Sequence, residues 1–364
     1  MTRPATNVIG GVDTHKHVHH AAVVAATGEL LATAEFSADH RGYDELLAWM
    51  KSHGSIDAIG VEGTGFYGAA LTQALLDADQ RVIEVNRPNP SARRADGKSD
   101  RLDAEQAARA VLGKTATAVP KTKTGRVEAI RILRVTRSSA VKARSQAFNA
   151  LHGIVVGAPS PLRDELIQVT KRTLVNRCLR LRPETDQLVG LTGDPDRLLL
   201  AAAKTALRDL ARRWKALDQE VKELSRQIKD LVELAAPELV ELFGVGTELA
   251  GQFLVTAGDN PERIHSEAAF AKLCGVAPQP ASSGRTTGRH RLSRSGDRAA
   301  NSALYTVTIV RMRHHPPTIE YVERRTAEGL TKREIIRCLK RYIAREIFKA
   351  LPRADRAQPL PEAA

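Results

Sequence analysis

The sequence predicts an α/β domain followed by a mainly helical region. Between residues 8 and 85, short apolar stretches alternate with amphipathic segments, which is typical of strands and helices that share one layered domain. From Leu207 to Leu234, apolar residues recur at steps of three and four with charged residues between them, which predicts one long helix. After Pro237, most stretches have helical periodicity, and one long polar loop interrupts them.

The N-terminal part is expected to contain strands and helices in the order β-β-β-α-β-α-β, followed by one more helix. The expected strands are Val8–Val12, Ala21–Ala26, Leu30–Phe36, Ile56–Val61 and Val82–Val85. The expected helices are His40–His53, Tyr67–Ala78 and Asp100–Leu112. Antiparallel strands come first, and a helical crossover then adds a parallel strand. This order predicts a mixed sheet of the ribonuclease-H-like type with helices on both faces.

The helix expected at Leu207–Leu234 has the apolar pattern of a coiled coil. Its a and d positions are Leu207, Leu210, Trp214, Leu217, Val221, Leu224, Ile228 and Leu231. Such a narrow stripe favours a partner helix, either from another chain or from the same chain as a hairpin; the alternative is an amphipathic helix packed on its own domain. At 1.5 Å per residue the helix spans roughly 40 Å. A second long helix with a basic face is expected at Arg126–Ile154.

With 364 residues, the chain is long enough for two or more domains. We expect an α/β domain at residues 1–115, a helical linker with the coiled coil at 116–236, a mainly helical C-terminal domain at 237–351 and a disordered tail at 352–364. A coiled coil between chains would make the protein a homo-oligomer, either a dimer or a tetramer.

The chain carries a formal net charge of +13, which is spread along its length. Nucleic acid is the commonest partner of such a protein, and the alternative is a basic protein without a polyanionic partner. The three cysteines are far apart and form neither a disulfide framework nor a CxxC motif, which fits a reducing cytoplasm. No apolar signal region begins the chain, and no apolar run approaches the roughly 20 residues of a membrane span.

Four carboxylates lie at the ends of elements that should meet. Asp13 ends the first expected strand and Glu62 ends the fourth, which is its neighbour in this type of sheet. Asp100 and Asp103 lie three residues apart at a helix start, where acids can also serve only as caps or complements of the helix dipole. Carboxylates that converge repel one another unless a cation neutralises them, and their hard oxygens suit Mg²⁺ or Mn²⁺. Two such ions can support phosphodiester cleavage.

Histidines follow Asp13 at positions 15, 17, 19 and 20. Their alternation along a strand favours a solvent-facing or interface row over a transition-metal site. Lys16, three residues past Asp13, is a candidate phosphate contact.

Two polar loops carry the arginines that could contact nucleic acid. The candidates are Arg93, Arg94 and Lys98 in the first loop, and Arg285, Arg289, Arg291, Arg294 and Arg298 in and after the second. Ser282 and Ser283 precede Gly284 in the second loop. A serine beside a glycine is usually part of a turn; here the arginines could instead bind a phosphate and stabilise charge during attack by a hydroxyl.

These residues resemble a known family, the DEDD transposases of the one-hundred-and-ten class of insertion sequences. The N-terminal stretches that carry the resemblance are Gly11–Lys16, Val61–Gly65 and Lys98–Ala104. The C-terminal stretches are Phe243–Gly246, Phe270–Pro278, Ser283-Gly284 and Leu292–Gly296. Together they cover nearly the whole chain in the family's order.

The resemblance implies a RuvC-like N-terminal domain, a coiled coil and a C-terminal transposase domain. It implies that Asp13, Glu62, Asp100 and Asp103 hold Mg²⁺, and that Ser283 is the nucleophile because the family's serine directly precedes the glycine. The family's pair of basic residues before the late glycine is Arg294-Ser295 here. The resemblance further implies recombination guided by a structured RNA, the bridge RNA, which pairs with donor and target DNA.

We therefore expect a DNA transposase or site-specific recombinase whose serine forms a covalent phosphoserine. One alternative is a RuvC-like, metal-dependent, structure-specific nuclease that uses water and the carboxylates alone. Another is a non-catalytic coiled-coil protein that binds nucleic acid. Because a rigid helix of roughly 40 Å would hold the carboxylates and Ser283 of one chain apart, a further hypothesis is an active site shared between chains of the oligomer.

Overall fold

The computed structural model describes residues 7–85, 99–184, 188–191, 193–260, 263–280, 290–292 and 296–352. Its contacts divide the chain into two compact units. The first unit combines the N-terminal residues up to Gly125 with Thr256–Asp297, and the second combines Arg126–Val255 with Arg298–Leu351.

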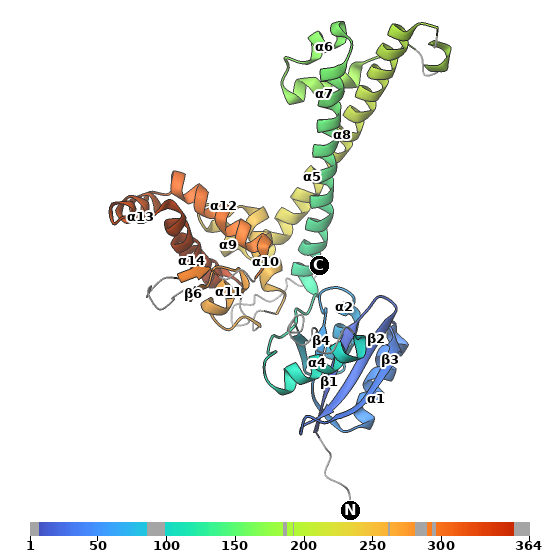
Figure 1. The fold of residues 1–364 in the computed structure, drawn as a ribbon. Coiled ribbons are helices and arrows are strands. Elements are labelled where there is room, and N and C mark those ends of the chain that lie inside the picture. Colours follow the sequence, from blue (N-terminus) through green and yellow to red (C-terminus); the bar gives the residue numbers. More distant parts are fainter. Residues whose placement is uncertain are drawn as a thin grey trace, which may run out of the picture. The chain divides into compact units, whose positions relative to one another are not determined.

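A mixed sheet forms the core of the first unit, as the sequence predicts (Figure 1). Its strands are β1 (Asn7–Thr14), β2 (Val18–Ala25), β3 (Leu30–Ser37), β4 (Ser55–Glu62) and β5 (Val82–Val85), in the spatial order β3-β2-β1-β4-β5. The first three strands pair antiparallel, whereas β4 and β5 add parallel to β1. The order of antiparallel and parallel strands expected for a ribonuclease-H-like sheet is confirmed.

Helices cover both faces of this sheet. Helices α1 (His40–Ser52) and α2 (Ala69–Asp77) bury Leu46, Met50 and Leu71 against the face that carries Val8 and Val12. Helix α4 (Asp100–Leu112) lies on the opposite face, where Ala108 packs with Ile9 and Val24. Two faces buried in this way explain why the central strands are apolar along nearly their whole length.

Helix α4 approaches β1 so closely that Gly11 has no room for a side chain. A Cβ atom at Gly11 would lie 2.1 Å from the carbonyl oxygen of Ala104 and 2.4 Å from the amide nitrogen of Ala108. Replacing Gly11 by alanine should therefore push α4 off the sheet and lower the free energy of unfolding by about 1–3 kcal/mol. Urea unfolding measures this loss. Gly65→Ala is the matched control because a Cβ there meets nothing within 4 Å, and equal stability of both variants would contradict the close approach.

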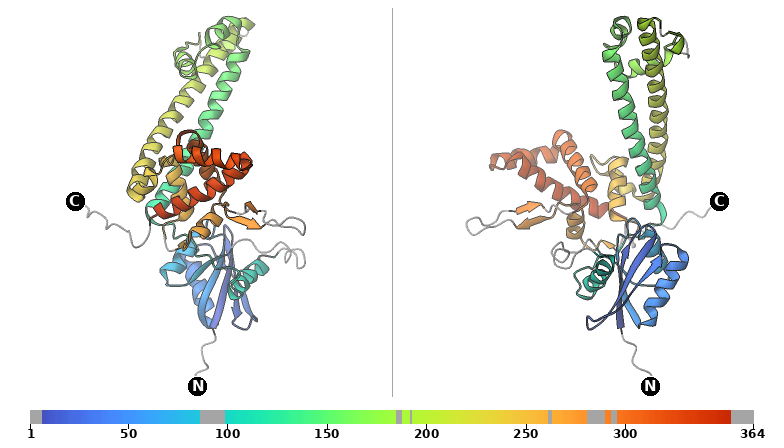
Figure 2. Two further views of the ribbon diagram at one scale, coloured as in Figure 1. Left: turned by 90° about the vertical axis from the view of Figure 1, so that its left-hand side faces the viewer. Right: turned by 45° about the vertical axis from the view of Figure 1, so that its right-hand side comes forward.

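The second unit contains a long helical hairpin. Helix α5 (Gly125–Gly157) and helix α8 (Pro195–Ala235) lie side by side in both views of Figure 2. They run antiparallel, because Arg137 donates to Ser225 (2.7 Å) and Arg144 donates to Asp218 (2.5 Å). The helices α6 (Ser160–Leu166) and α7 (Lys171–Arg180) and the short 3-10 turn η1 (Leu188–Leu191) connect them.

The expected heptad helix thus packs against a helix of its own chain. Of its a positions, Leu207, Val221 and Ile228 are buried and Trp214 is half-buried. Its d positions Leu210, Leu217, Leu224 and Leu231 are all half-buried. The two ends of the hairpin meet, since the Arg126 guanidinium donates to the carbonyl oxygen of Leu234 (3.3 Å). The two helix ends therefore lie together within the second unit, so the length of this helix does not by itself set how far apart other parts of the chain lie.

The rest of the chain is mainly helical. The helices are α9 (Pro237–Glu241), α10 (Thr247–Ala257), α11 (Glu267–Leu273), α12 (Arg298–His314), α13 (Pro316–Ala327) and α14 (Lys332–Ala350). In the second unit, the buried Arg311 side chain joins α12 to Glu346 of α14 (2.7 Å) and to the carbonyl oxygen of Phe243 (2.9 Å). The long polar loop expected after Pro237 contains a two-stranded hairpin of β6 (Pro278–Pro280) and β7 (His290–Leu292), which polarity alone did not indicate. Among the described helices, none is both long and apolar enough for a membrane span.

Candidate metal centre

The acidic cluster is formed where strand β1 reaches the first turn of helix α4. Alternate strand residues share a face, so Ile9, Gly11 and Asp13 all point toward α4. Ile9 packs with Ala108 near the end of the helix, and Gly11 faces Ala104 one turn earlier. Asp13 is the next residue in this series, and it lies beside the turn that begins at Asp100.

The carboxylates of Asp13, Asp100 and Asp103 converge. One oxygen from each lies within 4.8 Å of the oxygens of the other two. Asp13 and Asp103 are buried, whereas Asp100 is half-buried and gives the cluster an open side. A favourable interaction with the helix dipole can explain the two acids in the first turn of α4, but it does not explain the third carboxylate, which lies on β1.

Burial of the carboxyl group raises the pKa of Asp13. The neighbouring carboxylates of Asp103 and Asp100 raise this pKa further, whereas His15 and His20 lower it. A raised pKa means that the folded protein holds the negative charge at a cost. A bound cation would remove that cost, so the electrostatics of the cluster favour a cation ligand.

Glu62, the fourth predicted acid, ends strand β4. The register pairs Val12 with Val61, so Glu62 comes at the level of Asp13 on the neighbouring strand. Thr14 donates its hydroxyl hydrogen to the Glu62 carbonyl oxygen (2.7 Å), which ties the two strand ends together. Among the described residues, two groups of possible ligands lie within 4.8 Å, one of Asp13, Asp100 and Asp103 and one of His15, His20 and Asp100, and neither includes Glu62.

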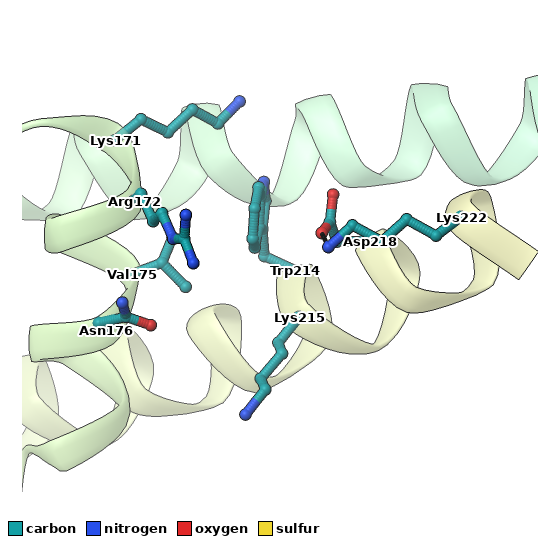
Figure 3. Close-up of a pocket in the computed structure, with 8 residues that line it drawn as sticks. All are labelled: Lys171, Arg172, Val175, Asn176, Trp214, Lys215, Asp218 and Lys222. Atoms are coloured by element: carbon teal, nitrogen blue, oxygen red, sulfur yellow. Dashed lines mark ion pairs between the residues drawn. The ribbon is translucent and has the colours of Figure 1, made fainter.

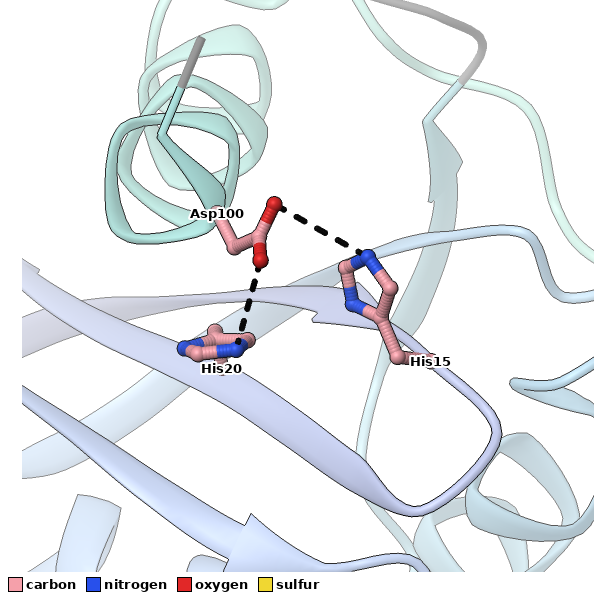
Figure 4. Close-up of side chains that lie close together, drawn as sticks. All are labelled: His15, His20 and Asp100. Carbon is pink, nitrogen blue, oxygen red and sulfur yellow. Dashed lines mark ion pairs between the residues drawn. The ribbon is translucent and has the colours of Figure 1, made fainter.

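Two histidines lie beside the acidic cluster. Figure 4 shows the rings of His15 and His20 next to the carboxylate of Asp100. The Nε2 atoms of His15 and His20 lie 3.8 Å and 3.7 Å from the two carboxylate oxygens of Asp100. His15 Nδ1 is also 3.8 Å from Asp13 Oδ2. The sequence interpretation missed these neighbours. The signal that could have found them is the antiparallel register, which pairs Asp13 with His20.

The histidines do not form one solvent-facing row. His19 is fully buried, its ring is stacked on Tyr43 with 5.7 Å between centroids, and its Nδ1 accepts a hydrogen bond from the His15 amide (3.4 Å). Burial lowers the pKa of His19, which keeps the ring neutral inside the core. The expectation of a solvent-facing or interface row is therefore wrong for His19. The His19 side chain lies on the face of the sheet that α1 covers, whereas the His20 side chain lies on the face that α4 covers.

The chemistry of this donor set fits a divalent cation. Carboxylate oxygens are the ligands of Mg²⁺ and Mn²⁺, and imidazole nitrogens are accepted more readily by Mn²⁺ and later metals than by Mg²⁺. Asp13, Asp100 and Asp103 could hold one ion, with His15 and His20 at its edge.

Metal binding at this cluster should be visible in the thermal stability. Because the folded pKa of Asp13 is raised, the native state binds more protons than the unfolded state between the two pKa values, and stability falls as pH rises through that range. Without a divalent cation, Asp13→Asn should therefore raise Tm at neutral pH. Adding Mg²⁺ or Mn²⁺ should raise the Tm of the natural protein and not that of the variant. Equal metal-induced shifts in calorimetry would contradict a site at Asp13.

The other candidate residues are only partly described. Lys16 is exposed in the turn between β1 and β2, Arg291 is exposed on β7, and Arg298 is exposed at the start of α12. The remaining candidates, Arg93, Arg94, Lys98, Ser283, Arg285, Arg289 and Arg294, lie outside the described residues. Pairing of Pro280 with His290 brings together the two ends of the segment that carries Ser283.

Two family models match the chain. A DEDD transposase model of the IS110 type matches residues 10–158, which include all four predicted acids. A model described as "Transposase IS116/IS110/IS902 family" matches residues 236–323, which include Ser283. The chain belongs to the IS110 family of transposases. Its N-terminal sheet has the mixed topology expected of the RuvC-like domain that the sequence resemblance implied.

Proteins of other insertion elements are similar to this IS110-family chain. The IS116 protein of Streptomyces clavuligerus is 24% identical over 368 residues, covering 91% of each chain. The IS900 protein of Mycobacterium paratuberculosis is 28% identical over 141 residues, which are 38% of this chain and 35% of the relative. The IS110 protein of Streptomyces coelicolor is 29% identical over 144 residues, covering 39% of this chain and 35% of the relative. The last two alignments thus cover about a third of each relative.

Proposed function

We propose that the chain is a DNA transposase that cleaves and rejoins DNA at the ends of an insertion element. The observation that carries this proposal is the convergence of Asp13, Asp100 and Asp103 in the region matched by the DEDD transposase model. Glu62 at the neighbouring strand end completes the acidic quartet. When bound there, Mg²⁺ or Mn²⁺ supplies positive charge that offsets the charge of a phosphodiester under attack.

Ser283 is the proposed nucleophile. Its Oγ forms a bond to phosphorus as the bond from phosphorus to the 3′ oxygen of the strand breaks. The serine proton is lost to solvent or a nearby base, and the leaving oxygen takes up a proton as a 3′ hydroxyl. The 3′ hydroxyl of the partner DNA then attacks the phosphoserine, which re-forms a phosphodiester and frees the serine. The number of ester bonds is conserved, so no external energy source is needed.

Arginines near Ser283 are proposed to hold the DNA backbone during these steps. Guanidinium groups bind phosphate oxygens in bidentate geometry. Arg285, Arg289, Arg291, Arg294 and Arg298 follow the serine, while Lys16, Arg93, Arg94 and Lys98 lie near the acidic residues in the sequence. The net charge of +13 supports contact with long polyanions, both donor and target DNA and the structured guide RNA that the family resemblance implies.

A homo-oligomer, dimer or tetramer, is proposed to assemble through the long hairpin. The half-buried d positions of α8 and the exposed Ile132 and Val135 of α5 offer apolar surface to a second copy. We retain the division into functional domains at 1–115, 116–236 and 237–351 as part of this proposal. The site of action is proposed to be the cytoplasm, with association to the nucleoid during transposition.

Sharing of the active site between chains is a hypothesis that now needs a direct test. The hypothesis was based on a long helix acting as a rigid spacer. That reason no longer holds, because the two ends of the helical hairpin lie together. Both Asp13 and the strands that bracket Ser283 belong to the first unit of one chain. A site within one chain is therefore an equal alternative.

The experiment that tests the proposed function is capture of a protein–DNA adduct. The purified protein is incubated with Mg²⁺, guide RNA and duplex DNA carrying the element end, then denatured and digested for mass spectrometry. A nucleotide attached to Ser283 is the expected result. Cleavage without any adduct would instead support the second candidate, a RuvC-like nuclease in which the carboxylates act on water. Absence of both reactions would leave only nucleic-acid binding without catalysis.

A further inference from the structure

Two histidines and one aspartate form a second group of possible metal ligands beside the acidic cluster. One ligand atom each from His15, His20 and Asp100 lies within 4.8 Å of the ligand atoms of the other two. The His15 Nε2 atom is 3.8 Å from Asp100 Oδ1, and the His20 Nε2 atom is 3.7 Å from Asp100 Oδ2. Both rings therefore face the same carboxylate, one ring at each oxygen (Figure 4).

The side chains that line the cavity between α7 and α8 do not converge in this way. Figure 3 shows the Lys215 side chain pointing away from Lys171 and Arg172. The carboxylate of this cavity, Asp218, already forms an ion pair with Lys222 (2.8 Å). The cavity therefore offers no single point at which several groups would meet one ligand.

The hairpin of β1 and β2 fixes the positions of the two histidines. His20 on β2 lies directly opposite Asp13 on β1, so the two side chains share one face of the sheet. His15 follows the end of β1, and its backbone amide donates to Nδ1 of the buried His19 ring (3.4 Å). This bond ties the start of the turn to the core of the domain, and strand pairing holds His20.

The rings face Asp100 from beyond hydrogen-bond distance. An N–H donor and an oxygen acceptor lie about 2.7–3.2 Å apart in a hydrogen bond, so separations of 3.7 and 3.8 Å are too long. Two ligands of one tetrahedral zinc ion, each about 2.0–2.1 Å from the metal, lie roughly 3.3 Å apart. The observed spacing is thus close to that of two groups bound to one ion, and small side-chain rotations would reach it.

A carboxylate lies behind each ring. The Nδ1 atom of His20 is 3.6 Å from Glu35 Oε1, and the Nδ1 atom of His15 is 3.8 Å from Asp13 Oδ2. Both Nδ1 atoms are buried without a hydrogen-bond partner. In metal sites, a carboxylate that accepts the Nδ1–H of a ligating histidine keeps the proton on Nδ1 and leaves Nε2 free for the metal. Glu35 and Asp13 are placed for this role, since each Nε2 atom is turned toward Asp100.

The composition of the group favours a late first-row metal over magnesium. Imidazole nitrogens suit Zn²⁺ and Ni²⁺, whereas Mg²⁺ prefers oxygen ligands and retains several waters. Two histidines and one carboxylate are a ligand set of zinc, with water in the fourth position. The acidic cluster offers three carboxylates instead, and the two groups share only Asp100.

We propose that His15, His20 and Asp100 form a zinc site, with the two Nε2 atoms and the Asp100 carboxylate as ligands and water completing the shell. The sequence pattern favoured a solvent-facing row of histidines over a transition-metal site. Strand register and the position of α4 reverse that preference for His15 and His20. The zinc site does not depend on DNA cleavage, so its failure and that of the proposed function are distinguishable.

The test is calorimetric titration of the metal-free, full-length chain with Zn²⁺, together with visible absorption spectra in Co²⁺. Co²⁺ takes the place of zinc in such sites, and it absorbs visible light much more strongly with four or five ligands than as the six-coordinate hydrated ion. His15→Gln/His20→Gln should remove this absorption. It should also lower zinc affinity by more than about a hundredfold, since losing only an outer partner of a ligand costs about tenfold to a hundredfold.

The matched control is His17→Gln/His40→Gln. It also removes two histidines, but both are exposed and neither belongs to a group of possible metal ligands among the described residues. Zinc affinity and the Co²⁺ spectrum should match those of the natural protein. Circular dichroism melting of each metal-free variant checks that it is folded.

Asp100→Asn and Asp103→Asn separate the zinc site from the acidic cluster. Both remove a carboxylate from the first turn of α4, but only Asp100 faces the histidines. Zinc binding should be lost in Asp100→Asn and retained in Asp103→Asn. Loss in Asp103→Asn as well would place zinc in the acidic cluster and overturn the proposal.

Equal zinc affinity of the natural protein and His15→Gln/His20→Gln would also overturn the proposal, and the histidines would then be ion-pair partners of Asp100 alone. An equal loss of affinity in His17→Gln/His40→Gln would have the same consequence, because zinc would then bind histidines without regard to their position.

Discussion

Replacing Asp13 by asparagine should reduce recombination at least about a thousandfold, the scale of losing a central electrostatic group in an active site. The change preserves the shape of a buried side chain and removes one of three converging carboxylates. With fewer oxygens of full negative charge, the cluster should lose affinity for a divalent cation. The readout is the rate of product formation in Mg²⁺, with Mn²⁺ as a second condition.

The control for this variant is Asp44→Asn. Asp44 is an exposed acid of helix α1, so its replacement changes the net charge equally without touching the cluster. Recombination by Asp44→Asn should match that of the natural protein. Activity of Asp13→Asn within a few-fold of the natural protein would exclude the acidic cluster from catalysis, and that result would favour a protein that only binds nucleic acid.

Replacing Ser283 by alanine should abolish both the covalent adduct and strand exchange, again by at least about a thousandfold, because no neighbouring water can form the phosphoserine. Binding of DNA and metal-induced stabilisation should be retained, since the acidic cluster is intact. Gel assays of adduct, cleavage and joined product separate these steps.

Ser282→Ala is the matched control for the nucleophile, because it removes the adjacent hydroxyl from the same segment. It should keep activity if Ser283 attacks. Loss in Ser282→Ala with activity in Ser283→Ala would move the nucleophile by one residue. Continued cutting by both variants would instead establish the water-using nuclease.

Mixing Asp13→Asn chains with Ser283→Ala chains decides whether one chain or two build the active site. In a shared site, mixed oligomers contain some sites with both groups intact, so activity should return. In a site within one chain, every site lacks one group and the mixture remains inactive.

The sequence by itself determined the N-terminal sheet and three members of its acidic cluster. Strand order followed from the positions of apolar stretches and turns, which also placed Asp13 at the end of the first strand. Asp100 and Asp103 were placed in the first turn of a predicted helix, a position where acidic residues are common. These features depend on residues close in sequence, and local spacing therefore specifies them.

Only the tertiary structure decided which elements pack together. The heptad pattern of Leu207–Leu234 fits a helix of the same chain or of another chain equally well, because an apolar stripe does not specify its partner. The contacts of Arg137 with Ser225 and of Arg144 with Asp218 select α5. His15 and His20 likewise reach Asp100 through strand register and helix placement, which depend on contacts distant in sequence.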